Sequence, residues 1–362
     1  MNMLIDISTA SPPFKVSQKR VSEELKVRMG GRPAIGRMIE SVSNNSGIDS
    51  RYFVIPDGEE NAASKFFTDK NSYLRPDTKT RMIVYEFWSK NLSIEAVEKL
   101  LNSNNIDPAD IERLITISCT GFYAPGIDYF LINNFNIPAD VKRTHIGFMG
   151  CAASLIGFSS SLEALNTLGK NKNILMVSTE ICSIHFQTEP TKDNILANLI
   201  FADGSAAALI SKETHKPGFQ ITETASYLFN GSAEYMGWEI GNFGFEMILS
   251  QALPKIILEK AMPQLKLILQ RFGVKTGDIK YWALHPGGRA ILDSIQKGLE
   301  LTDEEMIPSR TVLKNYGNMS SASILFVIKE IMTGNNIVKG EYCCAVAFGP
   351  GLTMEVALLK GT

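Results

Sequence analysis

Hydrophobic residues gather in short runs along this chain, and the runs alternate with longer stretches in which apolar residues recur every three or four positions. The short runs predict strands, because a strand buried on both faces is apolar along its whole length. The longer stretches predict helices with one apolar face. Strands are expected at residues 114–119, 173–178, 206–210, 282–285 and 343–348, and helices at 93–102, 153–168, 254–272, 290–299 and 320–332. This alternation predicts an α/β protein with largely parallel, covered sheets.

One pattern occurs twice along the chain. A strand ends at Ser118, and a small-residue corner with Cys151 follows 33 positions later, before an apolar helix and another strand. A second strand ends at His285, and a similar corner with Asn318 again follows 33 positions later. Ligand sites lie at the carboxyl ends of strands in parallel α/β sheets. Two related halves would therefore bring Cys151, His285 and Asn318 together.

Length, composition and charge narrow the class of protein. The chain has 362 residues, and single hydrophobic cores stop growing at roughly 250–300 residues, so two domains or two fused halves are expected. A hydrophobic fraction of 44% with 20% charged residues indicates a globular protein, and a net charge of −2 gives no footprint for nucleic acid. No apolar run of about 18 residues is present, so we expect no integral membrane protein. The first residues lack the apolar stretch of a signal peptide.

The five cysteines form no CxxC pair, so the sequence predicts neither a zinc site nor a disulfide framework. Reduced thiols indicate a cytoplasmic location.

Three residues could carry chemistry, although each also has a purely structural interpretation. Cys151 lies between small residues that permit a tight turn into a helix, whose dipole and N–H groups favour a thiolate. A free cysteine is nevertheless often a simple core residue. His285 closes a strand and opens a Pro-Gly-Gly turn, a loop position where function concentrates, but a lone histidine is more often structural. Asn318 precedes a helix, where asparagine is usually a cap.

Six segments, in order, resemble the chalcone synthase-like, type III polyketide synthase family from about Arg51 onward. The FGPGL loop is the most specific of them, with Ala347 in place of the first glycine of the family's GFGPG pattern. The resemblance implies a thiolase-like fold of two duplicated βαβαβαββ halves in α/β/α/β/α layers, residues 1–212 with the cysteine and 213–362 with the histidine and asparagine. The segments are TGFYAPGIDY (Thr120–Tyr129), GFMGCAAS (Gly147–Ser154), IFADGSAAA (Ile200–Ala208), MGWEIGNFGF (Met236–Phe245), HPGGRAILD (His285–Asp293) and the pair YGNMSSA and FGPGLTMEV (Tyr316–Ala322, Phe348–Val356).

The resemblance also implies a mechanism. Cys151 would take the starter acyl group as a thiolate paired with the imidazolium of His285. Decarboxylation of a malonyl thioester would give an enolate, held by His285 and Asn318 as an oxyanion hole. Repeated extension would end in cyclisation to a pyrone or resorcinol-type product. Malonyl-CoA and acyl-CoA are the implied substrates, and neither a metal nor a permanently bound cofactor is required.

Further site residues follow from the same resemblance. Phe201 and Phe245 match two gate phenylalanines between the cofactor tunnel and the acyl pocket. Ala124 replaces a methionine near the partner's pocket in the implied homodimer, and His185 replaces a small polar residue. We hypothesise a fatty acyl starter, because Ala124 could open a tunnel, although His185 would fill space. The pocket is expected to include Thr120, Ser320, Gly349, Pro350 and Gly351 as well.

The implied contacts for the phosphates of coenzyme A are poorly represented. In the family these basic residues lie just before Arg51, where this chain has only Arg37 as a match. An acyl carrier protein therefore remains an alternative starter donor.

Four other functions are less consistent with these segments. A 3-ketoacyl carrier-protein synthase III shares the fold and triad but condenses once, and the FGPGL loop argues against it. A hydroxymethylglutaryl synthase needs a glutamate near the cysteine corner, and Glu180 lies too deep in a predicted strand. A cysteine hydrolase would need no malonyl thioester, and a scaffold would need no triad.

Overall fold

The computed structural model describes residues 2–58, 66–67, 75–213, 217–334 and 337–362. In this part of the chain one large mixed sheet has the strand order β11-β12-β13-β8-β1-β7-β6-β4-β5. Its strands are β1 (Met3–Ala10), β4 (Ile111–Ser118), β5 (Lys142–Gly147), β6 (Asn173–Ile181), β7 (Asp203–Ser211), β8 (Phe219–Leu228), β11 (Ile279–Leu284), β12 (Tyr342–Gly349) and β13 (Thr353–Gly361). Two small sheets pair β2 (Phe14–Ser17) with β3 (Ser50–Phe53), and β9 (Met236–Gly241) with β10 (Gly244–Leu249).

The large sheet has the same strand order on both sides of the β1–β8 contact. In one direction β1 is followed by β7, β6 and β4, and in the other β8 is followed by β13, β12 and β11. Strands β7 and β13 each run antiparallel to both neighbours, so the sheet is mixed rather than largely parallel as expected. Strand β5 has no counterpart in the described second part. The predicted division after residue 212 falls between β7 and β8, next to residues outside the described part, and stays a prediction.

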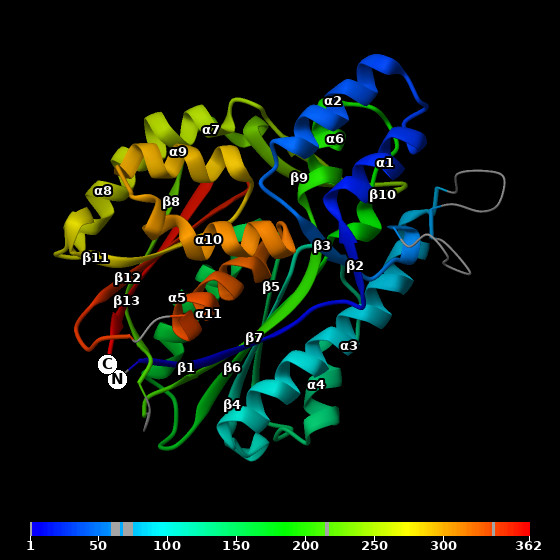
Figure 1. Ribbon diagram of the computed structural model, residues 1–362. Coiled ribbons are helices and arrows are strands. Elements are labelled where there is room, and N and C mark those ends of the chain that lie inside the picture. Colours follow the sequence, from blue (N-terminus) through cyan, green and yellow to red (C-terminus); the bar gives the residue numbers. More distant parts are fainter. Residues whose placement is uncertain (1, 59–65, 68–74, 214–216, 335–336) are drawn as a thin grey trace.

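Helices cover the sheet in layers (Figure 1). α5 and α11 lie in the middle of the molecule. Each contacts strands of both halves of the sheet, the half that begins with β1 and the half that begins with β8. α3 covers the opposite face of β1, β6 and β7, and α8 and α9 enclose a second core with β11–β13. The helices are α1 (Gln18–Arg28), α2 (Pro33–Asn44), α3 (Thr78–Asn104), α4 (Ile127–Phe135), α5 (Ala153–Leu165), α6 (Lys192–Ile200), α7 (Leu253–Ile256), α8 (Met262–Arg271), α9 (Arg289–Leu299), α10 (Asp303–Tyr316) and α11 (Ser323–Gly334).

Alternation along β11 and β12 explains why this part of the sheet is apolar on both faces. Trp282 and Cys344 belong to the core under α8 and α9, whereas Ala283 and Cys343 belong to the core that includes α11. Successive side chains of a strand point to opposite faces, so burial between two helical layers requires a continuous apolar run. The prediction of an α/β fold from such runs is confirmed by the layers.

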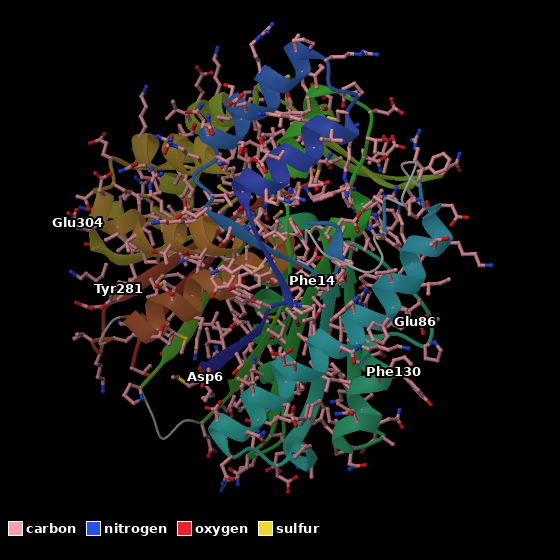
Figure 2. The ribbon with its side chains drawn as sticks, turned by 45° about the vertical axis from the view of Figure 1, so that its right-hand side comes forward. Asp6, Phe14, Glu86, Phe130, Tyr281 and Glu304 are labelled. Carbon is pink, nitrogen blue, oxygen red and sulfur yellow. The ribbon has the colours of Figure 1, made fainter. Side chains whose placement is uncertain are left out.

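The outer face of the first part of the sheet is closed by α3 and α4. In Figure 2, Glu86 of α3 and Phe130 of α4 lie next to each other on this face. Lys90 joins them, because its Nζ is 2.6 Å from the Glu86 carboxylate and 3.6 Å from the centre of the Phe130 ring. No helix in the described part of the chain is long and apolar enough to cross a membrane.

Most predicted elements are present with shifted ends. The helix expected at 93–102 is the last part of α3, which begins at Thr78. The helix expected at 254–272 is interrupted by a π-helical turn at Ile257–Ala261, between α7 and α8. Pro263 explains the interruption, because it has no N–H to donate to the preceding turn.

Candidate active site

The cysteine corner is a tight turn enclosed by the loop after β12. Cys151 lies in a 3₁₀ turn, Gly150–Ala152, that leads directly into α5. Gly150 has a φ of +61°, and a Cβ there would overlap the ring of Pro350. A Cβ on Gly349 would lie 2.7 Å from the carbonyl oxygen of Met149. Glycine is required at both positions, because Gly150 lies against the ring of Pro350 and Gly349 lies against the backbone of Met149.

The asparagine corner is built in the same way. Asn318 precedes a 3₁₀ turn, Ser320–Ala322, that leads into α11. The backbone N–H of Ser320 donates to Asn318 Oδ1 at 2.8 Å. This bond fixes the orientation of the amide. Oδ1 also accepts from the Cys151 thiol at 3.9 Å, and Nδ2, the donor of the amide, lies 4.0 Å from Cys151 Sγ.

Arg51 holds this corner against the end of α6. Its buried guanidinium donates to the carbonyl oxygens of Asn198 and Phe201, at 2.8 and 2.6 Å. The backbone N–H of Ala202 donates to the carbonyl oxygen of Asn318 at 2.8 Å. Burial lowers the pKa of Arg51 to about 9, so the side chain remains charged at neutral pH. These contacts position Asn318 and Phe201 relative to each other.

His285 directly follows β11 and is buried with no hydrogen-bond partner on either ring nitrogen among the described residues. Its backbone N–H donates to the carbonyl oxygen of Val346, which fixes the residue at the strand end. Buried polar side-chain atoms are normally hydrogen-bonded, so an unpaired imidazole indicates a place for a ligand.

Burial also determines the charge state of the cysteine and histidine. It raises the pKa of the Cys151 thiol to about 12 and lowers the pKa of His285 to about 3. Burial therefore disfavours the thiolate and the imidazolium when either charge is formed alone. The thiolate–imidazolium pair expected from the resemblance stays a prediction.

All three predicted catalytic residues line one cavity of about 310 Å³. Its walls are mostly apolar and come from α2, α6, α7, α9 and the β9–β10 hairpin. Lys192 and Arg289 also line it, and both are exposed. Sequence reasoning missed these two cations. Arg37, which it selected, is exposed on α2 beside the lining residue Met38 but is not itself part of the lining.

Two smaller cavities, of about 30 and 20 Å³, adjoin the large one. Phe201 and Met247 line all three, and both pack against Cys151 and Cys182. Phe245 lines only the 20 Å³ cavity, which Cys151 does not line, so its role beside Phe201 as a gate stays a prediction. Two positions along a strand move a side chain by roughly 7 Å, and the residue that reaches the cysteine is Met247.

The remaining pocket residues divide into three groups. Thr120, Ser320 and Pro350 line the 30 Å³ cavity, with Ser320 Oγ 3.7 Å from Cys151 Sγ. His185 lines the 20 Å³ cavity. Gly349 and Gly351 contribute backbone, since Gly351 N–H donates to the carbonyl oxygen of Met236.

Ala124 is exposed and lines none of these three cavities. The described residues include no group of three His, Cys, Asp or Glu side chains arranged to hold a metal ion.

A buried cysteine and an asparagine at two equivalent corners, with a histidine at a third strand end, define a thiolase-fold condensing enzyme. Two family models match the chain: "FAE1/Type III polyketide synthase-like protein" over residues 69–224 and "Chalcone and stilbene synthases, C-terminal domain" over residues 220–362. The chain belongs to the type III polyketide synthase family.

Relatives and solved structures agree along nearly the whole length. The chain is 26% identical to phloroglucinol synthase of Pseudomonas fluorescens, over 97% of each chain. It is 27% identical to 1,3,6,8-tetrahydroxynaphthalene synthase of Streptomyces peucetius, over 98% of this chain and 92% of that protein. The crystal structure of PKS-I from the brown alga Ectocarpus siliculosus superposes with a TM-score of 0.93 and 28% identity, covering 100% of this chain and 98% of that one. The chain is thus an acyltransferase of the polyketide synthase type.

Proposed function

We propose that this enzyme extends an acyl thioester starter by iterative decarboxylative Claisen condensation with malonyl-CoA and then cyclises the product to a pyrone or resorcinol type. One observation carries the assignment of roles. His285, whose ring is unpaired, lines the same cavity as Cys151 and as Asn318, whose Nδ2 lies 4.0 Å from the Cys151 sulfur. A second candidate, single condensation, has no feature of the site in its favour.

The first step is acyl transfer to Cys151. His285 takes the thiol proton, and the resulting thiolate attacks the carbonyl carbon of the starter thioester. The thiolate of coenzyme A leaves and receives the proton back from His285. Each charge is disfavoured by burial when formed alone, but proton transfer between the two groups forms both together, so each stabilises the other.

The second step is condensation. Malonyl-CoA loses carbon dioxide, and the electron pair of the broken C–C bond becomes an enolate. Its oxygen accepts hydrogen bonds from Asn318 Nδ2 and from the N–H of neutral His285. The enolate carbon attacks the acyl carbonyl on Cys151 and expels the thiolate. Neutral imidazole suits this step, because it retains a donor without competing as a charged partner.

Substrate delivery uses the large cavity. Its apolar walls fit the arm of coenzyme A, and the cations Lys192, Arg289 and Arg37 are placed to meet phosphates outside it. The same surface suits the phosphate-linked arm of an acyl carrier protein. The proposed mechanism uses no permanently bound cofactor. The proposed location of the enzyme is the cytoplasm, as expected from its cysteines.

The active enzyme in this proposal is a homodimer. Phe122, Phe148 and Met149 are large apolar side chains that are 54%, 37% and 40% exposed. Phe122 and Phe148 contact each other, and Ala124 lies two residues from Phe122. A partner covering this apolar patch would bring Ala124 to the interface. Light scattering on the purified protein measures the oligomeric state.

The test is incubation with malonyl-CoA and acyl-CoA starters of rising length, with products identified by mass. Cyclised products with two or more added two-carbon units, absent with Cys151→Ala, support the proposal. A product extended once indicates the ketoacyl synthase function instead. Free acid, or unchanged starter even when carrier-protein thioesters are supplied, contradicts the proposal.

A further inference from the structure

The space available to the growing chain lies on one side of Cys151. During every extension the arm of the malonyl thioester must occupy the 310 Å³ cavity to reach the cysteine. The acyl group on Cys151 therefore has to extend past Phe201 and Met247, where the cavities of about 30 and 20 Å³ lie. A single water molecule needs roughly 10–15 Å³ of cavity volume, so the 30 Å³ cavity has room for about two water molecules.

Trp238, on the β9–β10 hairpin, is a large side chain that lines both small cavities. It lies opposite Met247 in the β9–β10 pairing, and directly paired residues project from the same face of a sheet. The indole lines both small cavities but not the large one. It therefore fills space on the far side of Cys151 and leaves the route of the malonyl arm open.

Three contacts hold the indole in this position. Its Nε1–H donates to the carbonyl oxygen of Cys119 at 2.8 Å, in the loop after β4. Its ring meets those of His185 and Phe245 edge-on, with centroids 5.5 and 5.7 Å apart. Edge-to-face contacts at this spacing are favourable, so the ring is fixed rather than free to rotate out.

His185 in turn fixes the hairpin. Its Nδ1 accepts from the backbone N–H of Phe245 at 2.9 Å, and its Nε2–H donates to the carbonyl oxygen of Thr120 at 2.6 Å. The ring also stacks on Phe245, 4.2 Å between centroids. Both nitrogens are used, so His185 ties the inner face of the hairpin to the loop after β4.

We propose that Trp238 is the specificity-determining residue that restricts this synthase to short acyl starters and few extensions, with His185 as the positioning residue that holds its wall. This inference rests on the proposed function, and it departs from the fatty acyl starter hypothesised from the sequence. The substrate class is a short acyl-CoA such as acetyl-CoA, extended by malonyl-CoA.

The experiment compares wild type, Trp238→Ala, Trp238→Leu and Trp238→Phe with malonyl-CoA and either acetyl-, hexanoyl- or dodecanoyl-CoA. Wild type should use dodecanoyl-CoA about 10²-fold less well than acetyl-CoA, since a closed pocket discriminates strongly against added methylenes. The Ala variant, and the Leu variant to a smaller extent, should gain at least about tenfold with the longer starters and add at least one further two-carbon unit. The Phe variant should behave as wild type, because a ring still fills the space.

Glu239→Ala is the matched control, since Glu239 is exposed on the opposite face of the same strand. It should leave both starter range and product length unchanged. Wild type that accepts dodecanoyl-CoA as readily as acetyl-CoA would overturn the inference. So would Ala and Leu variants with unaltered products, or a Phe variant that matches the Ala variant.

Release of carbon dioxide from malonyl-CoA distinguishes failure of the proposed function from failure of the proposed role of Trp238. If wild type releases none and makes no product from any starter, the proposed function fails. If wild type and variants release it and make products, but substitution of Trp238 changes neither their length nor the starter range, only the present inference fails.

Discussion

Replacing Asn318 separates its two hydrogen bonds, because they serve different purposes. In Asn318→Ala the Nδ2 donor is lost, and the buried backbone N–H of Ser320 also loses its acceptor. Loss of one oxyanion donor costs about 10²–10³ in rate, or about 2.7–4 kcal/mol of transition-state stabilisation. An unsatisfied buried N–H costs about 1–3 kcal/mol of folding stability. Both quantities should fall in this variant.

Asn318→Asp is the matched variant. Its carboxylate keeps an oxygen for Ser320 N–H but offers no N–H to an enolate. We therefore expect Asp to restore the free energy of unfolding to within about 1 kcal/mol of wild type while decarboxylation stays about 10²–10³ lower. Acylation of the cysteine should persist in the Ala variant, since the thiol proton goes to His285.

The assays are carbon dioxide release from malonyl-CoA, urea unfolding and the mass of the acylated protein. Wild-type decarboxylation by the Asp variant would refute the donor role of Nδ2. Loss of acylation in the Ala variant, equal to its loss of decarboxylation, would show that Asn318 serves the nucleophile rather than the enolate.

Two further predictions concern the surroundings of the triad. In the unfolded chain His285 has a pKa near 6.5, whereas burial lowers its pKa to about 3 in the folded protein. Between these two pH values only the unfolded state binds the proton, so the free energy of unfolding falls as the pH drops. His285→Gln should remove about 1.4 kcal/mol of the change between pH 7.5 and 5.5 in urea unfolding, and an unaltered pH dependence would contradict the burial argument. Gly150→Ala should abolish product formation, because its Cβ would overlap Pro350, whereas Gly277→Ala, whose Cβ meets nothing within 4 Å, should leave activity intact; equal activity of the two variants would contradict the predicted overlap.

Periodicity predicted the central layers of the fold because buried strands and helices differ in their apolar spacing. The runs at 114–119 and 343–348 lie in β4 and β12. Periodicity could not predict the strand directions, because a strand buried on both faces has the same composition whether its neighbours run parallel or antiparallel. Strand β1, whose carboxylate Asp6 pairs with Lys329 of α11, lies in a mixed pattern that gave no strand signal.

The equal spacing of the two units predicted that Cys151 and Asn318 would meet, and the structure brings them to within 4.0 Å. The gate residues were harder to predict than the triad, because Phe245 and Met247 lie on the same face of β10. Which of the two reaches the cysteine depends on the position of the β9–β10 hairpin relative to Cys151. Met247 and Trp238 drew no attention as single residues in the sequence. Their importance depends on the pairing of β9 with β10 and on the loops that fix the hairpin.

The central claim is that Cys151 carries the growing chain, and the mass of the intact protein after brief exposure to acetyl-CoA tests it most directly. We predict one added acetyl group per chain, located on the peptide that contains Cys151 and absent from Cys151→Ala. Cys119→Ala, which removes a neighbouring buried thiol, should still be acylated. Acetylation that persists in Cys151→Ala, or that maps to another cysteine in wild type, would contradict the account.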